Sequence, residues 1–209
     1  MTDEGVKDLV VLAADKCIEA AVTGLLTRHE SLRIRQISYD SFTHPENDSG
    51  CRKYAGNILG PLSQRYTYAL VVFDRDGCGR EKDSSQTLEA SVRESLSAEG
   101  WGNRAEAVVI VPELEAWVWS DSPHVPSALG WQGQPTELRA YLEKQELWQA
   151  QASKPNAPKE CVQDVLRQAQ KPFSSAIFAR LAQNVGLARC TDPAFAKLKQ
   201  VLQQWFPAT

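Results

Sequence analysis

Acidic side chains follow three of the most apolar stretches in the sequence. Asp15 comes directly after "LVVLAA", Asp74 and Asp76 close "ALVVFDRD", and Glu113 and Glu115 follow "AVVIVP". Clustered carboxylates raise one another's pKa unless a cation compensates them, and their hard oxygens are the ligands that Mg²⁺ and Mn²⁺ take in proteins. The pattern therefore favours divalent-cation chemistry, in which the ion binds phosphate oxygens and lowers the pKa of an attacking water.

Each acidic motif also has a local structural explanation. Asp74 and Asp76 fit an Asx turn in which Gly77 supplies a positive φ, and Asp15 fits the N-cap of a following helix. Glu113 fits the first turn of a helix that begins near Pro112, where an acid interacts favourably with the helix dipole. The repetition at three predicted strand ends is what favours a shared site.

An α/β sheet would bring these acids together. The alternation of short apolar runs with helical periodicity predicts strands over 8–15, 32–40, 68–74 and 105–112 and helices over 16–28, 52–66 and 83–101. The segment 41–51 has turn chemistry. We therefore expect a mostly parallel sheet of about four strands flanked by helices. Its functional crevice would lie beyond the carboxyl ends of the strands.

The C-terminal third of the chain has a different pattern. Residues 120–135 read as a loop, and helical periodicity follows over 136–149, 158–170, 174–187 and 193–206. The expected organisation is an α/β domain over residues 1–120 and a helical cap or subdomain over residues 121–209.

Composition limits the class of protein. The chain has 209 residues with a formal charge of −3, and its five cysteines are scattered singly, which predicts reduced thiols and no zinc ribbon. No run of about 18 apolar residues is present, and acids stand at the N-terminus where a signal peptide carries positive charge. We expect a cytoplasmic protein without a membrane partner.

Charge is distributed unevenly. Residues 151–209 contain eight Lys/Arg and three Asp/Glu, a net charge of +5, so residues 1–150 carry −8. A basic segment can attract a nucleic acid, although a solvated helical surface explains it equally well. The candidate contacts to nucleic acid are Lys16, Arg75, Arg80, Lys154 and Lys159, which would otherwise balance nearby acids.

Other chemistries find little support in the sequence. It contains no G-x-S-x-G, no G-x-x-x-x-G-K-[ST] and no G-x-G-x-x-G, which disfavours a triad hydrolase and a nucleotide-binding enzyme. Trp117, Trp119, Trp131 and Trp148 are typical of core packing, with base stacking as the alternative.

Several of these segments together resemble a known family. "VVLAADK" and "LVVFDRDGCG" are similar to the acidic motifs of the TOPRIM domain found in topoisomerases, primases and nucleases of the overcoming-lysogenization-defect type. "VPELEAWVWSD", "KPNAPKE", "FSSAIFARLA" and "CTDPAFAKL" resemble small TOPRIM-like proteins encoded in bacterial phage-defence and DNA-modification loci. The resemblance runs from about Asp8 to Phe206 and implies a TOPRIM/Rossmann-like sheet.

The resemblance also implies a metal site. Asp15 takes the position of the TOPRIM glutamate, and Asp74 and Asp76 take that of its Asp-x-Asp pair. Glu115 would face the site, with Asp121 as a further ligand for Mg²⁺ or Mn²⁺.

Two functional hypotheses follow. The first is a metal-dependent nuclease that cleaves DNA or RNA phosphodiesters in an antiviral defence system, with other subunits of that system as partners. Lys16 stands where the TOPRIM motif has glycine. The second hypothesis is therefore a catalytically degenerate TOPRIM fold that acts as a non-catalytic binding subunit of a defence complex.

Overall fold

The computed structural model describes residues 5–187 and 190–208. Its centre is a four-stranded sheet in the order β2-β1-β3-β4. The strands are β1 (Lys7–Ala13), β2 (Tyr39–Thr43), β3 (Tyr66–Asp74) and β4 (Ala105–Ile110). Every pairing is parallel, so the predicted α/β fold is confirmed and all four carboxyl ends meet at one edge.

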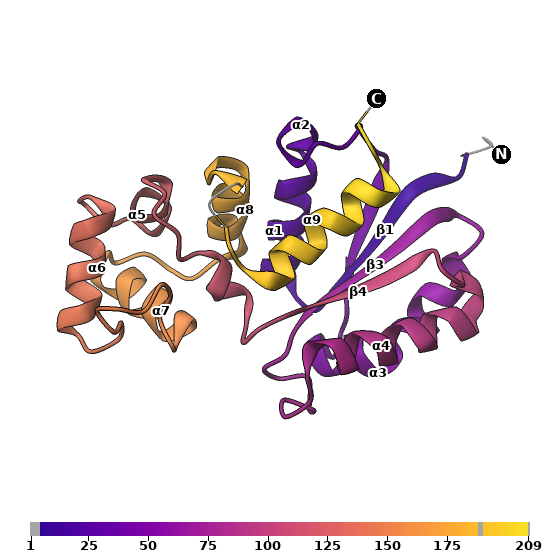
Figure 1. Cartoon of the computed structure of the whole chain (residues 1–209), viewed down its shortest axis with the longest axis horizontal. Helices are drawn as coiled ribbons and strands as arrows, with labels where there is room; N and C mark the ends of the chain where they lie inside the picture. The colour runs from indigo at the N-terminus through magenta and orange to yellow at the C-terminus, as the bar shows by residue number, and fades with distance from the viewer. Residues whose placement is uncertain (1–4, 188–189, 209) are drawn as a thin grey trace.

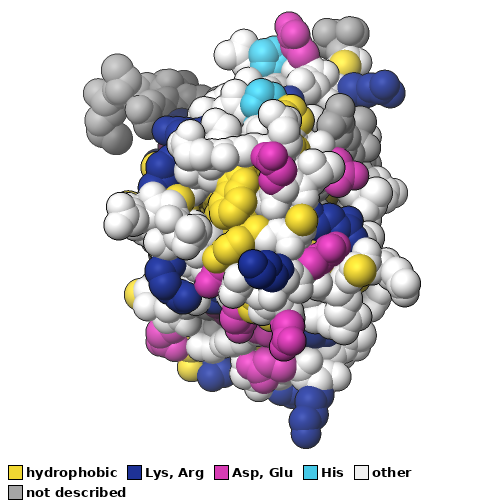
Figure 2. All heavy atoms as spheres, turned by 90° about the vertical axis from the view of Figure 1, so that its left-hand side faces the viewer, with side chains coloured by type: hydrophobic (Ala, Val, Ile, Leu, Met, Phe, Trp, Pro, Cys, Tyr) yellow, Lys and Arg dark blue, Asp and Glu magenta, His cyan; other side chains and the backbone are white. Residues whose placement is uncertain are grey.

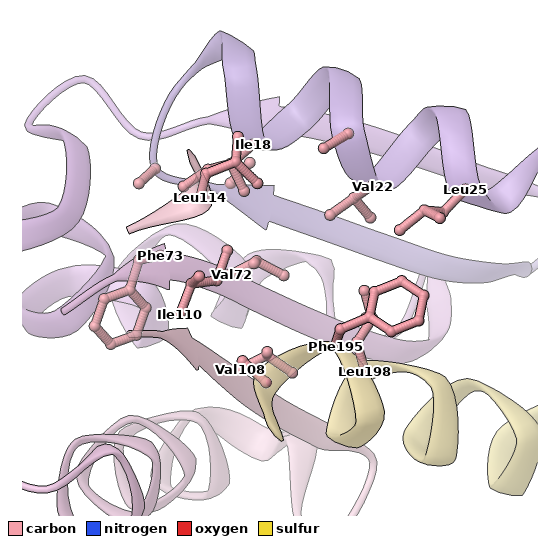
Figure 3. Close-up of a cluster of buried hydrophobic side chains, with 14 of the residues drawn as sticks. Ile18, Val22, Leu25, Val72, Phe73, Val108, Ile110, Leu114, Phe195 and Leu198 are labelled. Atoms are coloured by element: carbon pink, nitrogen blue, oxygen red, sulfur yellow. The ribbon is translucent and has the colours of Figure 1, made fainter. Parts of the chain in front are cut away.

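Helices cover both faces of the sheet (Figure 1). One face carries α1 (Lys16–Leu26) and α9 (Pro193–Trp205), and the other carries α3 (Asn47–Leu59) and α4 (Ser85–Leu96). Near-continuous apolar strands suit burial on both faces: in β1 the five residues from Leu9 to Ala13 are completely buried. Figure 3 shows part of the core between α1, the sheet and α9, with Val22 on α1 and with Val108 of β4 beside Phe195 of α9.

Shorter elements complete the sheet region. They are α2 (His29–Leu32), the 3₁₀ turn η1 (Gly60–Leu62), the π-helical turn η2 (Ser97–Trp101) and the 3₁₀ turn η3 (Leu114–Trp117). The C-terminal part adds α5 (His124–Leu129), α6 (Pro135–Lys144), α7 (Pro158–Gln168) and α8 (Ser175–Asn184). In Figure 1, α5, α6 and α7 form the end of the molecule away from the sheet.

Two C-terminal helices pack directly onto the α/β part. Helix α8 lies against α1, and a Cβ atom on Gly24 of α1 would come within 2.9 Å of the Ala182 side chain, so the glycine permits this close approach. Helix α9 packs on β4. Its Lys197 donates to the Ala107 carbonyl at 2.7 Å and pairs with Glu89 of α4 at 2.9 Å, which covers the edge of the sheet. The predicted domain boundary near residue 120 stays a prediction.

The second strand was placed wrongly by the sequence pattern. The predicted strand over 32–40 begins seven residues too early, because Leu32 ends α2 and Arg33 has a φ of 59°. Leu32 and Ile34 are buried without belonging to a strand of the sheet, and Ile34 instead forms an isolated bridge with Pro207. The apolar residues at these alternate positions therefore gave the sequence pattern of a strand, although they pack outside the sheet.

Two segments predicted as loops contain regular structure. Residues 41–43 continue β2 and Asn47 begins α3, whereas we expected turn chemistry over 41–51. The expected loop over 120–135 contains α5, whose prolines flank and enter its first turn. The remaining predicted helices and strands are found with their ends shifted by up to seven residues, the largest shift being that of α3, which ends at Leu59 and not at Tyr66.

Candidate functional site at the carboxyl edge of the sheet

The predicted acids gather where the chain changes direction across the sheet. From β1 the chain winds through α1 to the edge strand β2, whereas from β3 it winds through α4 to β4 at the opposite edge. The neighbouring carboxyl ends of β1 and β3 thus form a topological switch point, the usual place for a ligand crevice in such sheets. Asp15 follows β1 there and Asp74 ends β3.

Asp15 is the N-cap of α1, the structural role that its position in the sequence also fitted. Its Oδ1 atom accepts hydrogen bonds from the backbone N–H groups of Cys17 and Ile18, both at 2.8 Å, and so caps α1. Both bonds go to the same oxygen. The carboxylate nevertheless remains close enough to Asp48 and Glu115 to raise the pKa of each.

Asp74 carries the strongest electrostatic signal of the site. Its Oδ1 atom is buried and has no hydrogen-bond partner among the residues that the structure describes. Burial, followed by the charge of Asp48, raises the pKa of Asp74 well above its usual range, although the N–H of Leu114 acts in the opposite direction. A buried carboxyl oxygen without a donor is costly and calls for a functional explanation.

Asp48 is a member of the site that the sequence analysis missed. It lies in the first turn of α3, and its Oδ1 accepts a hydrogen bond from the backbone N–H of Asp74 at 2.7 Å. Burial and then the charge of Asp15 raise its pKa, against the effect of that hydrogen bond. The missed signal was positional: with β2 ending at Thr43, Asp48 follows a strand just as Asp15 does.

The two glutamates after β4 have different surroundings. Glu113 accepts hydrogen bonds from the backbone N–H and the Nζ of Lys159, each at 3.2 Å. Glu115 is buried, with 4% of its surface exposed. Burial, followed by the charges of Glu113 and Asp15, raises its pKa to about 7. Glu115 therefore lies within electrostatic reach of Asp15 and Asp74, and we call Asp15, Asp48, Asp74 and Glu115 the acidic crevice.

Two other groups report on the charge of the acidic crevice. Burial, and then the charges of Asp15, Glu115 and Asp74, raises the pKa of the Cys17 thiol to about 12, so Cys17 remains protonated at neutral pH. Burial lowers the pKa of Lys159, but Glu113, Glu115 and Asp74 outweigh this effect and the pKa is raised overall. Lys159, at the start of α7, thus brings a positive charge from the C-terminal part to the crevice.

Asp76 and Asp121, the other two predicted metal ligands, are exposed, unlike the residues of the acidic crevice. The side chain of Asp76 is 53% exposed and lies 3.8 Å from Arg75 Nε. Gly77 has a φ of +89°, in agreement with the expected turn. Asp121 is exposed and lines a pocket together with Trp119 and Trp148.

The predicted nucleic-acid contacts all take part in ion pairs within the chain. Their partners are Glu19 for Lys16, Asp76 for Arg75, Asp83 for Arg80, Asp192 for Lys154 and Glu113 for Lys159. The face seen in Figure 2 shows basic and acidic side chains interspersed. Arg189, part of the basic C-terminal segment, lies outside the described residues.

Lys154 belongs to a network that joins three of the family-like motifs. Asp192 is buried and accepts hydrogen bonds from Lys154 Nζ at 3.0 Å and from Trp117 Nε1 at 3.1 Å. The same side chain caps α9 through Ala194 and Phe195. The tryptophan of "ELEAW", the lysine of "KPNAPKE" and the aspartate of "CTDPAF" therefore fix η3, the connector before α7 and α9 to one another.

The donor types in the acidic crevice fit a hard divalent cation, since they are carboxylate oxygens and one of them is buried without a partner. Their spacing is not that of a closed site: over residues 5–187 and 190–208, no three His, Cys, Asp or Glu side chains form a group that could hold a metal ion. Closing a site would require these carboxylates to move together. No helix in the same ranges is long and apolar enough to cross a membrane.

All five cysteines are free, as expected. Comparison of the chain with family models, with curated proteins and with solved structures gives no match. The chemistry of the acidic crevice and the resemblance of the motifs are therefore the two indications of function.

Proposed function

We propose that this protein is a metal-dependent phosphodiesterase that cleaves DNA or RNA as part of a bacterial anti-phage defence system. The observation that carries the proposal is the carboxyl group of Asp74, with its unpartnered buried oxygen beside Asp48 at the switch point of the sheet. The similarity of the strand-end motifs to TOPRIM nucleases supports both the activity and the defence context.

The ligands for Mg²⁺ or Mn²⁺ would come from the acidic crevice. Asp74 and Asp48 are central because the charge of Asp48 raises the pKa of Asp74 and the backbone N–H of Asp74 donates to Asp48 Oδ1. Glu115 and Asp15 complete the set, since the charges of both also raise the pKa of Asp74. A bound divalent ion would supply charge stabilisation on a phosphate and a lowered pKa for water. It would also relieve the mutual repulsion that raises the pKa values of the acids.

The chain itself would position the substrate. Lys159 holds an ammonium group next to Glu113 and within electrostatic reach of Asp74 and Glu115, where it can contact a phosphate oxygen. Lys16, the residue after Asp15, carries its charge at an exposed position on the first turn of α1, where it pairs with Glu19. Trp117 and Asp192 keep the η3 segment in place through their hydrogen bond.

Cleavage by matched variants tests the proposal. Plasmid and single-stranded DNA or RNA are incubated with Mg²⁺ or Mn²⁺ and wild-type protein, Asp74→Asn or Asp76→Asn. We expect the wild type to cut, Asp74→Asn to fall to the background level and Asp76→Asn to retain most of its activity, because Asp76 is exposed whereas Asp74 has a buried Oδ1 in the crevice. Absence of metal-dependent cutting by the wild type, or unchanged cutting by Asp74→Asn, would overturn the proposal.

A second candidate is a non-catalytic binding subunit of a defence complex. Two observations favour it: Asp15 already serves as a helix cap, and Lys159 already supplies a cation to the acids. This account predicts no divalent-ion binding, and co-purification of a partner encoded by a neighbouring gene. Ion binding together with cleavage would exclude it.

A further inference from the structure

A short loop with two glycines lies between β3 and α4. Both glycines have a left-handed backbone, with a φ of +89° at Gly77 and of +78° at Gly79, a conformation that glycine adopts without the steric cost of a side chain. In a turn of this kind the backbone N–H groups of neighbouring residues point to one side and form an anion-binding concavity, called a nest. The loop is therefore a candidate anion site.

An anion from the chain itself already occupies this nest. The backbone N–H of Gly79 donates to Glu81 Oε1 at 2.8 Å. Hydrogen bonds from the backbone N–H groups of Glu81 itself, of Gly79 and of Gly77 lower the pKa of the Glu81 carboxyl. Three N–H donors of the loop are thus directed at one carboxylate.

Arg52 of α3 adds a positive charge to these donors. Its Nε donates to the Cys78 carbonyl at 2.7 Å, and a Cβ atom on Gly79 would lie 3.8 Å from its Nη2. The charge of Arg52 also lowers the pKa of the Glu81 carboxyl. Backbone N–H groups and a guanidinium are donors that proteins use to bind phosphate oxygens.

The loop adjoins the acidic crevice. A Cβ atom on Gly77 would lie 3.4 Å from Asp48 Oδ2, and the Oδ1 atom of the same carboxylate accepts from the Asp74 N–H. The start of the loop is fixed, because the backbone N–H of Asp76 donates to the Pro112 carbonyl at 3.1 Å. An anion in the nest would therefore lie beside the crevice, on the far side of Asp48 from Asp74.

Glu81 is well placed to leave the nest. It is exposed, and exposed side chains change rotamer within picoseconds to nanoseconds. A phosphate group carries a strong negative charge and several acceptor oxygens, so it can use the three N–H donors and Arg52 together.

We propose that residues 77–81 form a phosphate-binding loop, in which the Glu81 carboxylate is displaced by a phosphate group of the nucleic-acid strand next to the one at the acidic crevice; this rests on the proposed function. The loop would fix the register of the strand, which is the usual role of phosphate contacts. Glu81 keeps the N–H donors satisfied while no strand is bound.

Phosphate binding is measured in EDTA, without cleavage. The first probe is inorganic phosphate, titrated into isotope-labelled protein while the amide NMR signals of Gly77 and Gly79 are followed. Glu81→Gln removes the competing charge, and Glu94→Gln removes the same charge from an exposed position on α4. We expect saturable shifts of both glycine signals, at a phosphate concentration at least about threefold lower in Glu81→Gln than in Glu94→Gln, because an occupied site lowers the apparent affinity.

The second probe is a fluorescent single-stranded oligonucleotide, also in EDTA. Glu81→Gln should bind it at least about threefold more tightly than Glu94→Gln. Gly79→Ala should bind it more weakly than the control Gly102→Ala. Both glycines have a positive φ, of +78° and +57°, so both variants are strained, but only Gly79 belongs to the loop.

Two results would overturn the assignment of the loop. One is that phosphate leaves the Gly77 and Gly79 signals of Glu81→Gln unchanged, and the other is that Glu81→Gln and Glu94→Gln bind the oligonucleotide equally well. Neither result depends on catalysis. Absence of metal-dependent cleavage, with the expected phosphate and oligonucleotide binding, would contradict only the proposed activity.

Discussion

The acidic side chains at the two ends of the parallel sheet have opposite pKa shifts. At the amino end, Asp8 is paired with Arg35, and hydrogen bonds from Arg35 and Ser38 lower its pKa to about 2 in spite of partial burial. Asp40 is likewise bonded to Lys7 at 2.8 Å, which lowers its pKa. At the carboxyl end, burial and neighbouring acids raise the pKa of Asp74, and that of Glu115 to about 7.

This contrast separates acids that stabilise the fold from acids that do not. Compensated carboxylates lower the free energy of the folded chain, whereas a buried carboxyl without a matching donor raises it. Natural proteins retain such a cost mainly at functional sites. The opposite pKa shifts at the two ends therefore support the proposal that the site lies at the carboxyl end, and they do so independently of any motif.

The largest effect on stability is expected for Asp74. Replacing Asp74 by Asn removes a carboxyl whose ionised form is disfavoured by burial and by the charge of Asp48, and it keeps an oxygen that can accept from the Leu114 N–H. In EDTA at pH 8, we expect the free energy of unfolding in urea to rise by about 1–3 kcal/mol. The exposed control, Asp76→Asn, should change it by less than about 0.5 kcal/mol. A clear loss of stability in Asp74→Asn would mean that the Asp74 carboxyl is compensated after all.

Glu115 should set part of the pH dependence of stability. A carboxyl whose pKa is higher in the folded than in the unfolded chain contributes stability below its ordinary value and loses it as pH rises through the folded value. The ordinary value is 4.5 and the folded value about 7. Between pH 5 and pH 8, in EDTA, the free energy of unfolding of the wild type should therefore fall, with a contribution from Glu115 of about 1–3 kcal/mol.

Glu115→Gln provides the check on this pH dependence. Chemical denaturation at several pH values should show a shallower fall in the variant than in the wild type. Equal slopes for the two proteins would show that Glu115 does not titrate in this range.

Asp8 should behave in the opposite sense and with a smaller magnitude. Asp8→Asn weakens the pair with Arg35, so we expect a loss of about 1 kcal/mol at pH 7. Because the pKa of Asp8 is lowered to about 2 from 3.8, its contribution is present above about pH 4 and disappears as pH falls through 2. Acid denaturation curves of the two proteins should thus converge toward pH 2. A constant difference down to pH 2 would contradict the assignment.

Much of this arrangement could be predicted from the sequence. Apolar runs such as those of β1 and β3 predict buried parallel strands, and the acids that end or follow these strands can be located in the sequence. Asp48 could not be predicted, because its position after a strand depends on where β2 ends. The second strand was misplaced because Leu32 and Ile34 are buried by packing outside the sheet. The different environments of Asp74 and Asp76 likewise depend on tertiary contacts: Asp74 Oδ1 is buried and the Asp74 N–H donates to Asp48, whereas Asp76 is exposed beside Arg75.

The basic residues show the same limit. Lys154 and Lys159 stand five residues apart in one polar connector. In the fold, Lys154 pairs with the buried cap of α9, whereas Lys159 reaches the acidic crevice. The two lysines therefore have different roles, one structural and one at the candidate site, because of tertiary packing that no local sequence pattern encodes.

Calorimetric titration of Mn²⁺ into the wild type, Asp74→Asn and Asp76→Asn at pH 8 tests the central claim most directly. If the acidic crevice is a cation site, the wild type binds Mn²⁺, Asp74→Asn binds it at least about tenfold more weakly, and Asp76→Asn stays close to the wild type. Absence of binding to the wild type, or equal binding by Asp74→Asn, would contradict the assignment of the crevice as a metal site.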